Sequence, residues 1–187
     1  MNGFGAKNKN QRLNRKPISI TPSIEQIINK AIKLQLSGNI NEASKYYKFC
    51  LDNGINDPRV LCNYGLILRA FGDLEKAELL MEKSIRINPN DKLALNNLSG
   101  ILKDLGKYNE AEDILKKCLE IDQRDSTTYN NLGNILIYQG KIDEAEIIFN
   151  KGISINKNDK DAYLNLAILM KCSNKIDEAI KYTQKAI

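Results

Sequence analysis

The chain of 187 residues contains no histidine and no tryptophan, and only four prolines. Without histidine, the Ser-His and Cys-His pairs that activate nucleophiles are excluded, and so is every His-ligated metal site. No apolar run approaches the ~18–20 residues that a membrane-spanning helix requires. We therefore expect a soluble protein without catalytic residues, metal or cofactor, and its length suits a single domain.

Cysteine is also sparse, and its four copies are too far apart to form a C-x-x-C pair: Cys50, Cys62, Cys118 and Cys172. Residues 1–16 are basic and rich in asparagine, and no apolar stretch follows them as in a secretory signal. We expect a cytoplasmic protein, since unexported cysteines stay reduced, with buried or half-buried thiols that pack as small hydrophobes.

What the sequence does contain is a repeat of 34 residues. Alanines recur at this spacing, at Ala43, Ala77, Ala111, Ala145 and Ala179. Five positions before each stands a residue that readily takes the positive φ that ends a helix, namely Gly38, Gly72, Gly106, Gly140 and Asn174. The spacing predicts five units: 24–57, 58–91, 92–125, 126–159 and a truncated 160–187.

Each unit has the pattern of a helical hairpin. An aspartate precedes the first helix as an N-cap at Asp57, Asp91, Asp125 and Asp159. Ser23, with Gln26 three residues later, forms a capping-box pattern at the first unit. Apolar residues such as Leu61, Tyr64 and Leu68 then follow at helical spacing, and a second apolar stripe begins after the turn. This pattern predicts an all-α fold.

A 34-residue helix-turn-helix of this kind resembles the tetratricopeptide repeat (TPR) family, and the resemblance covers residues 24–187. The sequence departs from the family at Lys30, where a large apolar residue is usual, and it has leucine, tyrosine or isoleucine in place of the family's tryptophan. The resemblance implies a right-handed α-solenoid of about five TPR units with a concave binding face.

One position of the first helix holds asparagine in every unit: Asn29, Asn63, Asn97, Asn131 and Asn165. At about 100° per residue, this position lies nearly opposite the packing stripe. A carboxamide carries both a donor and an acceptor, so a row of them can pair with the backbone of an extended peptide. The row is similar to the asparagine ladder in the repeats of O-linked N-acetylglucosamine transferases, which implies that it grips a peptide backbone.

Duplication of one ancestral repeat is the alternative explanation for the ladder. Against it, the position one residue earlier has diverged, to Ile28, Cys62, Asn96, Asn130 and Leu164. Further side chains on the same side of the first helices are predicted to line the groove: Asn130, Asn134, Arg69, Lys103 and Tyr138. This mixture of amide, basic and aromatic groups suits a peptide better than a phosphate backbone.

Two functions remain open. The first is a non-catalytic scaffold for protein–protein interaction, which binds a peptide partner of unknown identity in the concave groove. The second is the repeat portion of a TPR-linked transferase, a glycosyltransferase or sulfotransferase, whose catalytic domain lies outside these residues. We also expect the uncapped C-terminal repeat to favour self-association, because solenoids usually need a polar terminal helix.

The net charge of +5 belongs to the N-terminal tail, residues 1–23, which we expect to be disordered. This tail holds five basic residues and no acidic one, so that the repeats contain equal numbers of each, 23 basic and 23 acidic. A basic tail alone supports only salt-sensitive binding to nucleic acid, without sequence preference. The neutral repeats argue against nucleic acid as the main partner.

Overall fold

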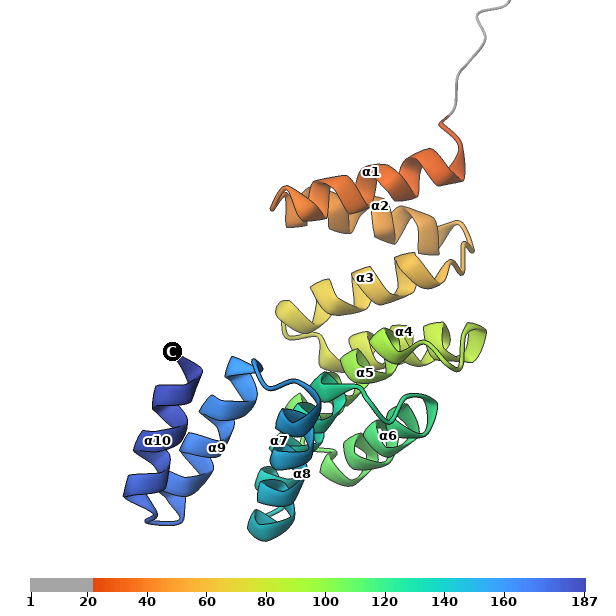
Figure 1. Ribbon diagram of the computed structural model, residues 1–187. Helices are drawn as coiled ribbons and strands as arrows, with labels where there is room; N and C mark the ends of the chain where they lie inside the picture. The colour runs from red at the N-terminus through yellow and green to blue at the C-terminus, as the bar shows by residue number, and fades with distance from the viewer. Residues whose placement is uncertain (1–21) are drawn as a thin grey trace, which may run out of the picture.

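The structure, a computed structural model, describes residues 22–187, and most of the tail 1–23 lies outside this part. The described residues form ten helices and no strand (Figure 1). The helices are α1 (Ile24–Leu36), α2 (Ile40–Asp52), α3 (Pro58–Ala70), α4 (Leu74–Ile87), α5 (Lys92–Asp104), α6 (Tyr108–Ile121), α7 (Ser126–Tyr138), α8 (Ile142–Ile155), α9 (Lys160–Cys172) and α10 (Ile176–Ala186). The predicted all-α solenoid of helix-turn-helix units is confirmed.

The local signals act where the sequence predicts them. The Ser23 hydroxyl accepts the amide N–H of Gln26, whose side chain accepts that of Ser23, so the capping box is formed. The four repeated aspartates each accept a backbone N–H in the first turn of α3, α5, α7 or α9. The turn glycines all have positive φ, and Asn174, with φ of 60°, takes the same conformation in the last unit. Each hairpin is thus defined by residues local to it.

The hairpins stack in chain order along a curved path (Figure 1). Each odd-numbered helix packs against the even-numbered helix that follows it, and that helix packs against the next odd-numbered one. The odd-numbered helices also contact one another from repeat to repeat, whereas within residues 22–187 no two even-numbered helices do. The odd-numbered helices therefore line the inner side of the curve.

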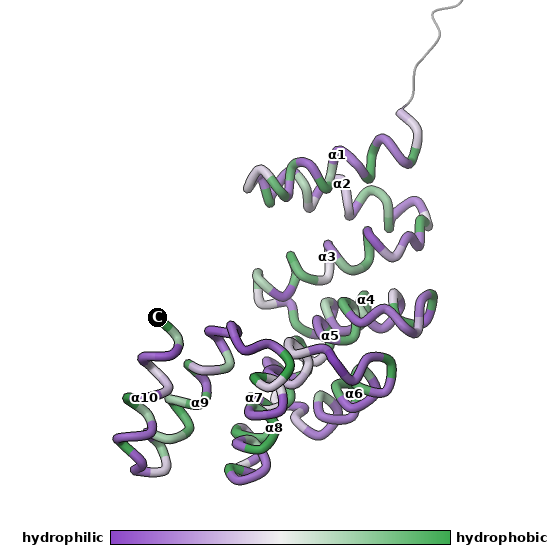
Figure 2. Tube along the Cα trace, in the orientation of Figure 1, coloured by the Kyte–Doolittle hydropathy of each residue, from purple (hydrophilic) through white to green (hydrophobic). Residues whose placement is uncertain are grey.

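Apolar and polar residues recur in turn along the helices (Figure 2), as expected for amphipathic helices that bury one face against their neighbours. Leu61 of α3 and Ala77 and Met81 of α4 are fully buried between the two helices. In the first repeat, the unusual Lys30 places its ammonium 4.7 Å from the centre of the Tyr46 ring. A cation over an aromatic face is favourable, which explains why this departure from the apolar pattern is tolerated.

An ion pair recurs between neighbouring repeats, at a spacing of 29 residues. Lysine Nζ lies 2.7–3.5 Å from the carboxylate in each pair: Lys107–Glu78, Lys141–Glu112 and Lys175–Glu146. Glu112 also pairs with Lys116 of its own helix and is itself buried. Burial alone would raise the pKa of Glu112, but hydrogen bonds from Lys116, Lys141 and Gln139 outweigh it and lower this pKa to about 2.

Replacing Glu112 with glutamine is expected to lower the free energy of unfolding by about 2 kcal/mol at neutral pH. Because folding lowers the pKa from 4.5 to about 2, this stabilisation is present above the ordinary pKa and is lost as the pH falls towards 2. Urea denaturation followed by circular dichroism at a series of pH values measures the difference. Glu120→Gln, at an exposed site on the same helix, is the control, and equal losses for both variants would contradict the prediction.

The expectation of four buried or half-buried thiols is wrong for one of them. Cys50 and Cys118 are buried and Cys62 is half-buried, but Cys172 is exposed. Cys172 ends α9 at the repeat position that holds Ala70, Asp104 and Tyr138 in earlier units, and all of these are exposed as well. The position lies beyond the packing stripe, so no neighbouring helix covers it.

Candidate functional site

The ladder asparagines occupy one equivalent position on each odd-numbered helix, and these helices line the inner side of the solenoid. Asn29 on α1 is exposed, whereas Asn63, Asn97, Asn131 and Asn165 are half-buried. The carboxamide of Asn29 donates to Glu25 of its own helix, at 3.2 Å. The row therefore runs from an exposed end on α1 into a more enclosed stretch over the following repeats.

Two ladder asparagines are tied to the preceding repeat. Asn131 Nδ2 donates to Asn96 Oδ1 at 2.8 Å, and Asn165 Nδ2 donates to Asn130 Oδ1 at 2.9 Å. Each bond uses one of the four hydrogen-bonding positions of the ladder carboxamide, leaving its second N–H and its carbonyl oxygen for other partners. The Asn131 and Asn165 side chains are thus each oriented by a hydrogen bond within the protein.

A polar network behind the ladder fixes the orientation of Asn96. Its Nδ2 donates to Thr128 Oγ1 at 2.9 Å and to the Lys92 carbonyl at 3.0 Å, and it lies 3.3 Å from Cys118 Sγ. Because the amide nitrogen is held there, the oxygen is the atom that meets Asn131. Burial raises the pKa of Cys118, so this thiol stays protonated in the network.

Sequence reasoning missed the role of Asn96 and treated Asn130 only as a residue of the groove. The signal was the spacing: each accepting asparagine stands 35 residues before its donor, one more than the repeat length. A position 34 residues earlier is the equivalent position on the preceding odd-numbered helix. The accepting asparagine stands one residue before that position, and its side chain therefore points towards the next odd-numbered helix.

A hollow of about 300 Å³ opens between α3, α5 and α7. It brings together five of the predicted site residues: Arg69, Asn97, Lys103, Asn131 and Asn134. Residues that were not predicted also line it, among them Leu93 and Thr127 on the side away from the cations. The other five predicted site residues do not line this hollow: Asn29, Asn63, Asn130, Asn165 and Tyr138.

The basic residues of the hollow have defined partners. Arg69 Nε donates to Asp104 Oδ2 at 2.6 Å, and Lys103 Nζ lies 3.6 Å from Asp104 Oδ1. Lys103 Nζ is also 5.8 Å from the centre of the Tyr138 ring, which stacks on Tyr108 with ring centres 5.3 Å apart. Tyr138 therefore extends the basic end of the hollow as an exposed aromatic surface.

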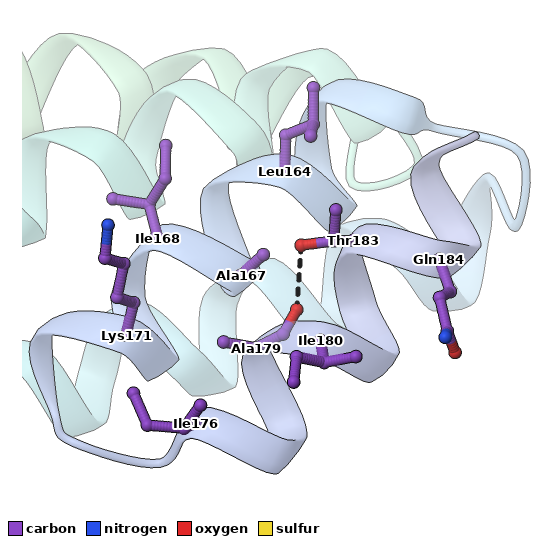
Figure 3. Close-up of a pocket in the computed structure, with 9 residues that line it drawn as sticks. All are labelled: Leu164, Ala167, Ile168, Lys171, Ile176, Ala179, Ile180, Thr183 and Gln184. Atoms are coloured by element: carbon purple, nitrogen blue, oxygen red, sulfur yellow. Dashed lines mark hydrogen bonds between the residues drawn. The ribbon is translucent and has the colours of Figure 1, made fainter.

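A second hollow, of about 410 Å³, lies between α9 and α10 (Figure 3). Its walls are mostly apolar, with Leu164 and Ile168 from α9 and Ile176 and Ile180 from α10. Thr183 Oγ1 donates to the Ala179 carbonyl at 2.8 Å, so this hydroxyl is already partnered within its own helix. Self-association through this last repeat stays a prediction.

Within residues 22–187, no group of three or more histidine, cysteine, aspartate or glutamate side chains is placed to hold a metal ion. In the same part of the chain, no helix is both long and apolar enough to cross a membrane.

Stacked helical hairpins with an inner face of first helices define an α-solenoid repeat protein. Two sequence profiles, each described as tetratricopeptide repeat, match residues 58–91 and 91–158, which together are more than half of the chain. The chain belongs to the tetratricopeptide repeat family. No curated protein matches the sequence.

Many solved structures share the fold. MamA from Desulfovibrio magneticus RS-1, from residue 41 to its end, is 19% identical with a TM-score of 0.75, over 87% of this chain and 92% of that one. A tetratricopeptide repeat protein from Parabacteroides merdae ATCC 43184 is 24% identical with a TM-score of 0.79, over 87% and 63%. YrrB, described as a TPR protein with an unusual peptide-binding site, is 20% identical with a TM-score of 0.68, over 88% and 85%. Identities this low establish the shared fold alone.

Proposed function

We propose that this protein is a non-catalytic interaction module that binds an extended peptide along the inner face of its odd-numbered helices. The observation that carries the proposal is the oriented ladder. The carboxamides of Asn131 and Asn165 are each held by one hydrogen bond to the previous repeat, and each keeps a donor and an acceptor for a ligand. The hollow beside Asn97 and Asn131 provides the space.

The spacing of the ladder suits a peptide backbone. Packed helices lie about 8–10 Å apart, and an extended chain rises about 3.3 Å per residue. Successive asparagines can therefore meet roughly every third peptide group, whatever the intervening side chains are. Peptide binding by YrrB, a protein of the same fold, is consistent with this use of a TPR array.

Replacing Asn97 and Asn131 together with alanine is expected to weaken peptide binding about tenfold. The reason is that each lost hydrogen bond costs about 0.5–1.5 kcal/mol. The probe is a display library of random dodecapeptides selected on the wild-type protein, and fluorescence anisotropy gives the Kd of selected peptides for both proteins. Circular dichroism checks that the variant keeps its helicity.

The matched control replaces two asparagines away from the inner face, Asn88 after α4 and Asn150 on α8, both of them exposed. This control is expected to bind the selected peptides as tightly as the wild type. If the ladder variant binds them with unchanged affinity, or if the library yields no binder, the proposed function is wrong.

The alternative is that these repeats belong to a TPR-linked transferase, and it draws on the apolar surface left open at the last repeat and on the likeness of the asparagine ladder. It is a hypothesis about what the gene encodes beyond these residues. Reading the coding sequence beyond Ile187 tests it, since an open frame that encodes a transferase domain would support it and a stop codon would contradict it.

A further inference from the structure

One end of the central hollow carries more positive than negative charge. Two cations, Arg69 of α3 and Lys103 of α5, lie beside a single carboxylate, Asp104. Arginine has five N–H donors and lysine three, so one aspartate cannot satisfy them all. The side chains of Arg69 and Lys103 are only 30% and 32% exposed, and partial burial strengthens their attraction for an anion.

Gly100 sets the position of the Arg69 guanidinium. A Cβ at this residue would lie 2.8 Å from Arg69 Nη1 and 3.2 Å from its Cζ. The guanidinium therefore lies directly against the backbone of α5, in the space that a larger residue would fill. Equivalent positions in other repeats hold larger residues, among them Leu66, Asn134 and Ile168. The space that the Arg69 guanidinium occupies at Gly100 is therefore specific to the boundary between the second and third repeats.

The cationic end lies within reach of a peptide on the ladder. Lys103 follows Asn97 by six residues on α5, which is about 9 Å along the helix, and both residues line the same hollow. When a peptide backbone is bound at Asn97, a side chain of that peptide can reach along α5 towards Lys103. The long side chain of Lys103 covers the rest of this distance.

We infer that the groove selects extended peptides that carry a carboxylate opposite Arg69 and Lys103, from an aspartate or glutamate side chain or from the peptide's C-terminus. This inference rests on the proposed function and states which peptides the groove prefers. Hydrogen bonds between a guanidinium and a carboxylate are about twice as strong as neutral ones. The carboxylate would satisfy donors that Asp104 leaves open.

The test uses the same dodecapeptide library on the wild-type protein and on the double variant Arg69→Gln with Lys103→Gln. The control, Lys83→Gln with Lys117→Gln, removes the same charge from exposed sites on even-numbered helices. We expect wild type and control to enrich acidic residues severalfold over the input library, and the groove variant to enrich none.

A selected acidic peptide is then compared with versions in which Asp becomes Asn or Glu becomes Gln, and in which the C-terminus is amidated. The carboxylate that matters is the one whose neutralisation weakens binding to the wild type about tenfold, with little effect on the groove variant. Because this change is made in the peptide, it does not depend on how the protein variant folds.

The two proposals fail in different ways. If peptides lose affinity for the ladder variant but the selected pool shows no acidic enrichment, the carboxylate inference is wrong and peptide binding stands. If acidic peptides bind the ladder variant and the wild type equally well, ladder-mediated binding is wrong. If acidic enrichment survives in Arg69→Gln with Lys103→Gln, the cations assigned here do not produce the selectivity.

Discussion

A chain with Phe149→Ala is expected to lose about 3–5 kcal/mol of its free energy of unfolding, through lost burial and the cavity left behind. Phe149 lies on α8 and is fully buried, against Gly133 of α7. In a solenoid each repeat is stabilised by its neighbours, so the loss in the fourth repeat also weakens the contacts that hold the third and fifth. Urea denaturation followed by circular dichroism measures this effect.

Phe49→Ala is the matched control, because it removes the same side chain from a site on α2 that is 49% exposed. Its cost is expected to stay below about 1 kcal/mol. Losses of similar size for the two variants would contradict the prediction that burial of Phe149 between α7 and α8 stabilises the protein.

Gly133→Ala is expected to destabilise the protein by about 2 kcal/mol. A Cβ at this position would lie 2.6–2.8 Å from three atoms of the Phe149 ring, closer than carbon atoms pack. The ring is fully buried and cannot swing into solvent, so α7 and α8 must separate. Overpacking of this kind costs about 1–3 kcal/mol, more than alanine gains over glycine in a helix.

Gly65→Ala tests the same substitution at the equivalent position of α3. There a Cβ would lie 3.4 Å from the Ala77 carbonyl oxygen and 3.5 Å from the flexible end of Met81. The substitution is expected to be neutral or stabilising, since alanine favours a helix by about 1 kcal/mol. If Gly133→Ala is as well tolerated as Gly65→Ala, the close contact with Phe149 does not limit the packing of this repeat.

The hairpins could be predicted from the sequence because their signals are local and repeated. A cap such as Asp57 acts within one turn of helix, and the turn at Gly72 needs only a positive φ. Five copies of one period then place the ten helices of residues 22–187, since each hairpin can bury its apolar faces only against its neighbours. The exposure of Cys172 was not predicted, because its position lies outside the apolar packing stripe of α9 and its burial depends on whether another helix covers it.

The groove was predictable only as a set of positions. A helical wheel places Asn97 and Asn131 on one face, but it treats each helix alone. The bond from Asn131 to Asn96 depends on the stagger between α5 and α7, and the seat of Arg69 depends on Gly100 in the next repeat. Both are contacts between repeats, and the periodicity of one helix contains no information about them.

The most direct test of the proposed binding mode is nuclear magnetic resonance of the side-chain amides during titration with a selected peptide. If the ladder grips the peptide, the carboxamide N–H resonances of Asn97 and Asn131 will shift in proportion to occupancy, while that of Asn150, on an even-numbered helix, will stay in place. Shifts confined to even-numbered helices or to the α9–α10 hollow, with the ladder resonances unmoved, would contradict it.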